Sequence, residues 1–367
     1  MAATVYFTGM HSRSLDNNKC AKVARLCDAL QLKKVLKRND LAAVKIHFGE
    51  YGNDTHIKPM FARVAVDKMK AAGAKPFLTD TTTLYSGTRH NAVDHLHTAY
   101  LHGFTPETVG APVIIADGLY GEEDVPVRIN CKHFKDVRIA AAIRRVPSMV
   151  VLSHFKGHEM AGFGGAIKNL AMGGASVAGK RDQHGVHVQI DESLCVGCGR
   201  CVKVCPQKAL TLVNGKSHVD VSRCIGCFEC ITVCPVRPNK AISIDWSSEM
   251  VPFVERLTEY AYGVVKGKQK HICYINFVLN VTPDCDCVGW SDMPLVPDLG
   301  ILASMDPVAL DQACYDLVNK APAFDPKIAE AKTDKFTARW PHTRGEVQLS
   351  YGEAIGLGTR EYKLEKI

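Results

Sequence analysis

The first 150 residues of the chain alternate between short apolar runs and longer stretches whose apolar residues recur at helical spacing. The runs typical of strands are 4–7, 41–48, 75–80, 113–116 and 148–153. The stretches typical of helices are 20–30, 59–72 and 91–101. Strands that alternate with helices in this way predict an α/β domain whose sheet is mostly parallel.

The same alternation resumes late in the chain. A helical pattern over 251–262 precedes an apolar run over 271–279. Asp306 and Pro307 then have the residue types of a helix N-cap and a first helical position, followed by an amphipathic helix. The tail beyond Lys320 is polar, and we expect it to wrap the surface.

Two copies of one cysteine motif lie between these parts. Each copy reads C-x2-C-x2-C-x3-C-P, as in bacterial ferredoxins, where three cysteines hold one 4Fe–4S cluster and the fourth belongs to the other cluster. The predicted ligands of the first cluster are Cys195, Cys198, Cys201 and Cys234. Those of the second cluster are Cys224, Cys227, Cys230 and Cys205. Structural zinc sites are the alternative, but zinc gives no reason for the third cysteine or for the proline after the fourth.

The sequence therefore predicts a discontinuous α/β domain with an inserted α+β two-cluster ferredoxin-like domain. The predicted parts are 1–186 for the first part of the α/β domain, 187–246 for the insert, and 247–367 for the second part with the C-terminal tail.

Composition is that of an ordinary globular protein of about two domains, with 367 residues, 46% hydrophobic and 23% charged. No signal peptide and no apolar run long enough for a bilayer is recognisable, and thiolate-bound clusters favour a reducing compartment, so we expect a cytoplasmic protein. The net charge of +7 is scattered, without the basic and aromatic stripe of a nucleic-acid surface. This charge fits a small anionic substrate or an acidic redox partner protein, and the sequence leaves the oligomeric state open.

A glycine-rich run follows the strand predicted at 148–153. It reads Gly162-Phe-Gly164-Gly165-Ala-Ile-Lys168-Asn169. Glycines that open a helix expose backbone amides and the positive end of the helix dipole, which suits a bound anion or a closely packed cofactor. Lys168 adds a charge or, if desolvated, a nucleophilic amine. A plain tight turn is the alternative.

Two further cysteines, Cys285 and Cys287, follow the predicted strand at 271–279 and are flanked by Asp284 and Asp286. In extended chain the side chains of residues i and i+2 point to opposite faces, so a disulfide between these two is disfavoured. Metal ligation, including a third cluster or a mononuclear ion, redox chemistry at a thiolate, and simple burial remain as interpretations.

Together these motifs resemble a family of unknown function numbered 362. The resemblance rests on five stretches: Asp80-Thr-Thr-Thr-Leu-Tyr85, the glycine run with Lys168 and Asn169, the ferredoxin-like insert, residues 284–287 and residues 306–311. It implies two 4Fe–4S clusters. We assign a cofactor-binding role to Asp80, Gly162, Gly164, Gly165 and Asn169.

A more distant resemblance is to lactate racemases, which carry a nickel pincer nucleotide on a lysine and exchange protons with two histidines. Here His158 lies 10 positions before Lys168, and His184 lies 16 positions after it, similar to the racemase spacing. His90, in Gly-Thr-Arg-His, is similar to the segment of the other acid/base histidine, with Arg and His exchanged. The racemases have a proline where Ala171-Met-Gly173 stands and have no ferredoxin insert. The resemblance implies a shared scaffold and cleft, with room for a further metal or nucleotide-type cofactor.

The leading hypothesis is a low-potential iron–sulfur oxidoreductase, of a kind typical of anaerobic metabolism, that passes single electrons to a small anionic substrate or second cofactor in an α/β cleft. The candidate catalytic residues are His158, Lys168, His184, His90, Cys285 and Cys287. One alternative is a non-enzymatic electron carrier that docks redox partner proteins. Another is a racemase-like isomerase with a metal or nickel pincer cofactor.

Overall fold

The computed structural model describes residues 2–85, 87–184, 187–221, 223–224, 226, 229–236, 240–244 and 246–367, with the backbone alone described at 244 and 246–249. Its centre is an eight-stranded sheet of mostly parallel strands, which confirms the predicted α/β class. The strand order is β16 (Tyr362–Lys366), β1 (Ala3–Gly9), β15 (Gly300–Ser304), β14 (Ile272–Val278), β7 (Ser148–His154), β2 (Leu41–Lys45), β3 (Lys75–Asp80) and β4 (Val113–Ile115). Only β15 among these strands runs antiparallel to its neighbours.

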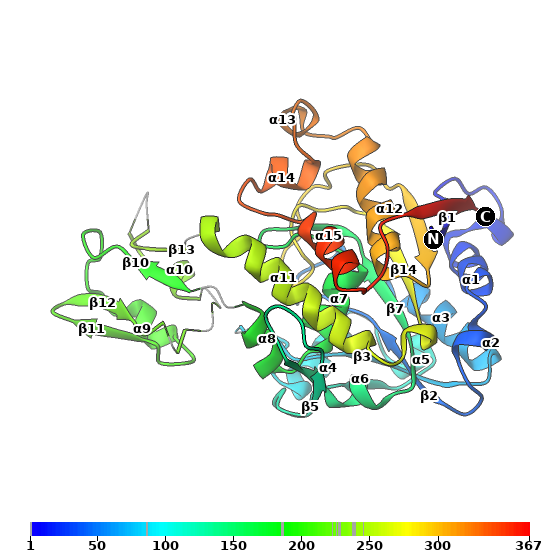
Figure 1. Cartoon of the computed structure of the whole chain (residues 1–367), viewed down its shortest axis with the longest axis horizontal. Coiled ribbons are helices and arrows are strands. Elements are labelled where there is room, and N and C mark those ends of the chain that lie inside the picture. The colour runs from blue at the N-terminus through cyan, green and yellow to red at the C-terminus, as the bar shows by residue number, and fades with distance from the viewer. Residues whose placement is uncertain are drawn as a thin grey trace.

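Helices cover both faces of this sheet, as the crossovers of a parallel sheet require (Figure 1). Neighbouring residues on one strand face different layers, so Val150 packs into one apolar core and Val151 into the other. The helices of the first core are α1 (Lys19–Ala29), α2 (Leu32–Val35), α3 (Pro59–Ala71), α4 (Ala92–Leu101) and α5 (Pro106–Val109). Those of the second are α7 (Ala166–Gly174), α11 (Trp246–Val265), α12 (Pro307–Lys320) and α15 (Val347–Ala354).

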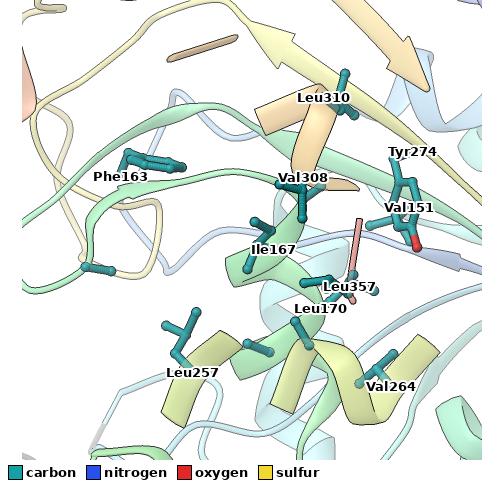
Figure 2. Packing of buried hydrophobic residues seen from close by; sticks show 14 of the residues in the cluster. Val151, Phe163, Ile167, Leu170, Leu257, Val264, Tyr274, Val308, Leu310 and Leu357 are labelled. Carbon is teal, nitrogen blue, oxygen red and sulfur yellow. The ribbon is translucent and has the colours of Figure 1, made fainter. Parts of the chain in front are cut away.

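The second core contains the helix that opens with the glycine run. Figure 2 shows Ile167 and Leu170 of α7 among apolar side chains of α11, α12 and the sheet. Both side chains are fully buried, as are Leu257 and Val308 beside them. Burying each such side chain stabilises the fold by about 1.5–3 kcal/mol, so this packing fixes the position of α7 against the sheet.

Shorter elements complete the α/β part. They are η1 (Leu15–Asn17), β5 (Asp124–Arg128), β6 (Asp136–Ala140), α6 (Ala141–Arg145), β8 (Lys156–His158), β9 (Gly162–Gly164), α8 (Val177–His184), η2 (Gln269–His271), α13 (Pro326–Ala329) and α14 (Lys335–Arg339). No helix among the described residues is long and apolar enough to cross a membrane.

Residues 188–244 form a separate lobe at the left end of the molecule (Figure 1). Its elements are β10 (Val188–Ile190), α9 (Arg200–Val204), β11 (Leu210–Val213), β12 (Lys216–Val219), α10 (Glu229–Val233) and β13 (Ile242–Ile244). Strand β10 pairs with β13 and β11 with β12, both antiparallel. The lobe has an apolar core of its own, which includes Val188, Leu210 and Ile242 together with several of its cysteines.

The C-terminal tail corrects one expectation. Instead of only wrapping the surface, it adds β16, which pairs in parallel with β1 at the edge of the sheet. Leu349 and Leu357 of the same tail are buried in the second core. The tail is polar on average, but these apolar residues are spaced so that α15 packs against α11 and α12.

Candidate functional site

A cavity of about 180 Å³ lies where β2, β3 and β7 end, the edge at which parallel sheets commonly bind ligands. The structure brings together several residues that were predicted from separate motifs. Asp80, His158, Lys168, His184 and Cys287 all line this cavity.

His90 was predicted as a site residue, but it lies outside the cavity lining. Its side chain is 52% exposed, and its Nδ1 lies 2.7 Å from the carbonyl oxygen of Gly87. The neighbouring Arg89 is the buried member of this segment, with 2% of its side chain exposed. The order Arg-His in this chain therefore directs the guanidinium, not the imidazole, to the cavity.

Arg89 holds one side of the cavity together. Its Nε donates to Glu50 at 3.0 Å, and its terminal nitrogens lie 2.7 Å from the Tyr85 hydroxyl and 3.1 Å from His47 Nε2. Tyr85 in turn donates to the carbonyl oxygen of Cys287 at 3.0 Å. The buried guanidinium thus donates to a carboxylate and to a neutral hydroxyl, and it links the β3 loop to the cysteine turn.

Asp80 and Asn169 belong to a second buried network. Lys45 donates to Asp80 Oδ1 at 2.8 Å and to the side-chain oxygen of Asn169 at 2.7 Å. The amide nitrogen of Asn169 donates to Leu152 and Ser153. Both residues were predicted to bind a cofactor. In the structure Asn169 is engaged by the protein, whereas Asp80 Oδ2 is buried without a hydrogen bond among the described residues and lies at the cavity.

The glycine run has a different role from the predicted one. The first amides of α7, at Ala166 and Ile167, donate to the carboxylate of Asp311 at 2.8 and 2.9 Å. The negative charge at the start of α7 is therefore that of Asp311, a residue of α12. A Cβ on Gly162 would lie 2.7 Å from the backbone of Gly345, while one on Gly164 would be 3.3 Å from Lys168. These glycines allow close packing of the chain against itself.

Cys285 and Cys287 lie in a turn rather than in extended chain, which corrects the expectation that their side chains point apart. The amide of Val288 donates to the carbonyl oxygen of Cys285 at 3.1 Å and closes the turn. The two sulfur atoms lie within 4.8 Å of each other. Lys168 Nζ lies 3.6 Å from Cys285 Sγ, so the lysine of the glycine run faces the cysteine pair.

His158 lies beside this pair. Donor atoms of His158, Cys285 and Cys287 all lie within 4.8 Å of one another, and in the described part of the chain this is the group that could hold a metal ion. The backbone amides of Met160 and Ala161 donate to His158 Nδ1 at 3.0 and 3.1 Å. These two bonds fix the orientation of the ring.

The electrostatics of the cavity favour an anion. Arg89, Lys168 and Lys180 line it against the carboxylates Asp80 and Glu159. Burial raises the pKa of Glu159 to about 7, so that its negative charge is partly lost near neutrality. Burial lowers the pKa of Lys180 to about 8, which keeps most of its charge at pH 7.

The histidines of the cavity are neutral bases or donors. Burial, reinforced by nearby cations, lowers the pKa of His47 and His158 well below the usual value. For His184, burial and the Lys168 ammonium lower the pKa to about 4, and its buried Nδ1 has no hydrogen-bond partner among the described residues. A neutral imidazole with an unoccupied nitrogen can accept or deliver a proton at a bound ligand.

A second, much smaller cavity lies in the lobe of residues 188–244. Its volume is about 20 Å³, and its lining includes Cys195, Cys198, Cys201 and Cys234. Three of these cysteines come from the first motif and one from the second. Ser217 donates from its backbone amide to Cys195 Sγ at 3.3 Å.

The other motif is described in part. Cys205, Cys224 and Cys230 belong to the core of the lobe, and the amide of Ala209 donates to Cys205 Sγ at 3.3 Å. Cys227, the remaining predicted ligand, lies outside the described residues. Gly226, between Cys224 and Cys230, lines the cavity of about 180 Å³ in the α/β part. The second motif therefore reaches the candidate site.

Several residues in and around the cavity were not among the predicted site residues. They are Lys45, Tyr85, Arg89, Lys156, Glu159 and Lys180. The signal that could have identified some of them is a charged residue within or directly after an apolar strand. Lys45 interrupts the run 41–48, and Lys156 follows the strand at 148–153. Such a lysine must be paired or serve a site, because burying an unpaired charge is costly.

The fold and the two cavities define an α/β protein with a cysteine-rich lobe beside a cationic pocket. The family model described as Domain of unknown function (DUF362) matches residues 42–316, and the chain belongs to this family. No curated protein matches the chain.

Two solved structures are similar to it over part of their length. One is the lactate racemase apoprotein from Thermoanaerobacterium thermosaccharolyticum, with 13% identity, a TM-score of 0.39, and coverage of 76% of this chain and 51% of that chain. The other is a protein from Thermotoga maritima, with 10% identity, a TM-score of 0.36, and coverage of 83% and 60%. The chain thus spans about half of the length of the racemase.

Proposed function

We propose that this protein is an iron–sulfur redox enzyme that acts on a small anionic molecule in the cavity of the α/β part. The observation that carries the proposal is the small cavity lined by Cys195, Cys198, Cys201 and Cys234. These cysteines lie up to 39 positions apart in the sequence, yet they surround one space, as the ligands of a single 4Fe–4S cluster must.

The chemistry of the donors fits such a cluster. Cys195 and Cys205 each accept a hydrogen bond from a backbone amide, and Cys201 Sγ lies 3.2 Å from the Ser217 hydroxyl. Hydrogen bonds to cluster sulfurs stabilise the reduced, more negative state and so raise the reduction potential. Bound clusters supply single electrons at low potential.

The second cysteine motif links the proposed source of electrons to the cavity. Gly226, between its cysteines, lines the space that also contains Lys168, His184 and Cys287. A cluster held by Cys205, Cys224, Cys227 and Cys230 then lies beside the anion pocket. An electron carrier that only docks partners has no need for buried cations and neutral histidines beside its cluster, which favours the enzyme over the carrier.

The residues of this chain have separable tasks in that reaction. Arg89, Lys168 and Lys180 attract and orient the anionic group. His184, with its unoccupied Nδ1, and Glu159, whose pKa lies near neutrality, hold or move the protons that accompany electron transfer. We further propose a cytoplasmic location and a redox partner protein as electron source or sink, since the clusters need a reducing compartment and a supply of electrons.

The test is anaerobic purification of the full chain with iron and acid-labile sulfide analysis. Two clusters require about eight iron and eight sulfide per chain and a paramagnetic signal on reduction. Cys198→Ser should lower the iron content by up to half, whereas the control Cys20→Ser, at a half-buried cysteine outside both motifs, should leave it unchanged. Iron absent from the wild type, or bound zinc in its place, contradicts the proposal.

A racemase-like isomerase is the second candidate, favoured by the gathering of His158, Lys168 and His184 in one cavity. His90 was predicted as one of the proton carriers of such an isomerase, but its side chain is half-exposed, which disfavours the isomerase. Stoichiometric nickel together with a mass addition on Lys168 would establish the isomerase. Iron without nickel, and an unmodified Lys168, favour the redox enzyme.

A further inference from the structure

We propose that Cys285 and Cys287, the second of which lines the cavity of about 180 Å³, form a redox-active dithiol–disulfide pair. The pair stores two electrons beside the iron–sulfur lobe. The inference rests on the proposed function for its reductant, which we name as a one-electron donor of the iron–sulfur class. The pair itself is argued from the geometry of the turn and its surroundings.

The turn brings the two sulfurs together. The hydrogen bond from Val288 to Cys285 reverses the chain across the two cysteines, and the sulfurs lie within 4.8 Å of each other. A disulfide has its sulfurs about 2.05 Å apart, so closing it requires the side chains to rotate toward each other within the same turn.

The surroundings stabilise an anionic sulfur. Lys168 Nζ donates to Cys285 Sγ at 3.6 Å, and Lys156 lies on the same side, 3.7 Å from the carboxylate of Asp286. A neighbouring ammonium increases the thiolate fraction of a cysteine, and thiolates are the reactive species in disulfide exchange. Asp286 is buried in contact with His154 at 2.8 Å, so its charge is compensated within the protein.

The same contacts disfavour a metal ion. His158 accepts two backbone hydrogen bonds at Nδ1, and its neutral ring then carries the proton on Nε2. A ring in this tautomer has no lone pair left for a metal, because Nδ1 accepts the two amides and Nε2 carries the proton. The ammonium of Lys168 also lies where it would repel a divalent cation at Cys285. The group of His158, Cys285 and Cys287 therefore suits thiolate chemistry better than coordination.

Reduction and reoxidation of the pair each transfer two electrons and one proton. In the reducing direction the S–S bond breaks and takes up two electrons, delivered one at a time by the iron–sulfur donor. Cys287 takes one proton and becomes a thiol, while Cys285 becomes the thiolate that faces Lys168. In the reverse direction the thiol and the thiolate lose two electrons, one at a time, to the oxidised form of the iron–sulfur donor, Cys287 releases its proton, and the disulfide forms again.

Differential alkylation of the anaerobically purified full chain tests the pair. One sample is treated with the thiol oxidant diamide and one with dithiothreitol. The protein in each sample is unfolded in the presence of N-ethylmaleimide, which blocks the free thiols, buried ones included, and it is then reduced and labelled with iodoacetamide. After diamide, Cys285 and Cys287 should both carry the iodoacetamide label, and after dithiothreitol both should carry N-ethylmaleimide. Cys20 and Cys131, half-buried cysteines outside the cavity, should carry N-ethylmaleimide in both samples.

A variant separates the role of Lys168 from general effects of the cavity. Lys168→Met should slow alkylation of Cys285 at pH 7 at least about tenfold, because the thiolate loses its ammonium partner. Lys180→Met removes another cation from the same cavity without touching the sulfurs, and it should slow alkylation much less. Equal effects of the two variants would overturn the assignment of Lys168.

Two further results would overturn the pair. One is that both cysteines keep the N-ethylmaleimide label after diamide. The other is equimolar zinc in the wild type that is lost from the Cys285→Ser/Cys287→Ser variant. Iron and sulfide measured on the same samples keep this inference distinct from the proposed function. A disulfide that forms in a chain without iron supports the pair and refutes the iron–sulfur enzyme.

Discussion

The carboxylate of Asp311 occupies the space beside Gly165 that any side chain at that position would need. A Cβ on Gly165 would lie 2.4 Å from Asp311 Oδ1. The same carboxylate accepts the first two amides of α7 and the side-chain amide of Asn276 at 2.6 Å. One residue of α12 thus caps α7, holds β14 and excludes an external anion from the helix start.

Gly165→Ala should destabilise the protein by about 1–3 kcal/mol, because the new methyl group must displace a buried carboxylate that has three donors. The matched control is Gly9→Ala in β1, where the nearest atom to an added Cβ is 3.9 Å away. The control should change the free energy of unfolding by less than about 0.5 kcal/mol. Denaturant unfolding of the two variants and the wild type measures both effects. Equal stability of Gly165→Ala and the wild type would show that α7 does not depend on this contact.

Asp311 also predicts a dependence of stability on pH. Burial raises the pKa of Asp311 to about 6 in the folded protein, whereas the unfolded carboxyl ionises near about 3.9. The folded state therefore binds more protons between these values, and the contribution of Asp311 to stability is largest below about pH 4 and falls as pH rises through about 6.

Asp311→Asn removes this titration. The free energy of unfolding of the wild type relative to the variant should fall by up to about 3 kcal/mol between pH 4 and pH 7. The measurement is unfolding of both proteins at a series of pH values in this range. A difference that does not vary with pH would contradict the raised pKa.

The architecture was predicted well from the sequence wherever an element depends on residues that are close together in the chain. The cap of α12 is an example, since the Asp306 carboxylate accepts the amides of Val308 and Ala309 as its residue type implies. The predicted strands at 148–153 and 271–279 are found as β7 and β14, because fully buried parallel strands are long apolar runs. Such features depend on residues that are near each other in the chain.

The candidate site was predicted less completely, because its decisive contacts join distant residues. Asp311 and Ala166 are 145 positions apart, and no local pattern shows that one caps the other. The choice between Arg89 and His90 depends on a single backbone turn, which a motif comparison cannot resolve. The side chains of Cys285 and Cys287 converge because of the turn at Val288, whereas the spacing alone implied extended chain.

Arg89 and His90 offer a matched pair of adjacent variants. Arg89→Met leaves the buried Glu50 carboxylate without its guanidinium partner, which should cost about 3–5 kcal/mol of stability. His90→Ala removes a half-exposed ring and should stay within about 0.5 kcal/mol of the wild type. Thermal or denaturant unfolding distinguishes the two. A larger loss for His90→Ala than for Arg89→Met would contradict the described orientation of this segment.

Lys180 should make anion binding dependent on pH. Burial lowers the pKa of Lys180 to about 8, so its charge is present at pH 7 and is lost as pH rises through about 8. Affinity for sulfate, whose charge is constant in this range, should therefore fall by up to about tenfold between pH 7 and pH 9, as expected for losing about 1.4 kcal/mol of attraction. Calorimetric titration with sulfate measures this change.

Two variants control that measurement. Lys180→Met should bind sulfate weakly at pH 7 and keep only the smaller fall in affinity that the ionisation of Glu159 causes as pH rises above 7. Lys363→Met, at a lysine with 74% of its side chain exposed, should behave like the wild type. If Lys180→Met retained the full pH dependence, the titrating group would have to be another residue of the cavity.

The crossed pairing of the cysteine motifs makes a prediction about double variants. Cys195 and Cys234 line the same small cavity although they belong to different motifs, whereas Cys205 of the first motif is assigned to the other cluster. Cys195→Ser/Cys234→Ser should therefore lose no more iron than either single variant, about four atoms per chain, because both changes affect one cluster. Cys195→Ser/Cys205→Ser should lose nearly all of the iron, because each change affects a different cluster. Iron analysis after anaerobic purification decides between them, and the opposite ranking of the two double variants would mean that each motif holds its own cluster without exchange.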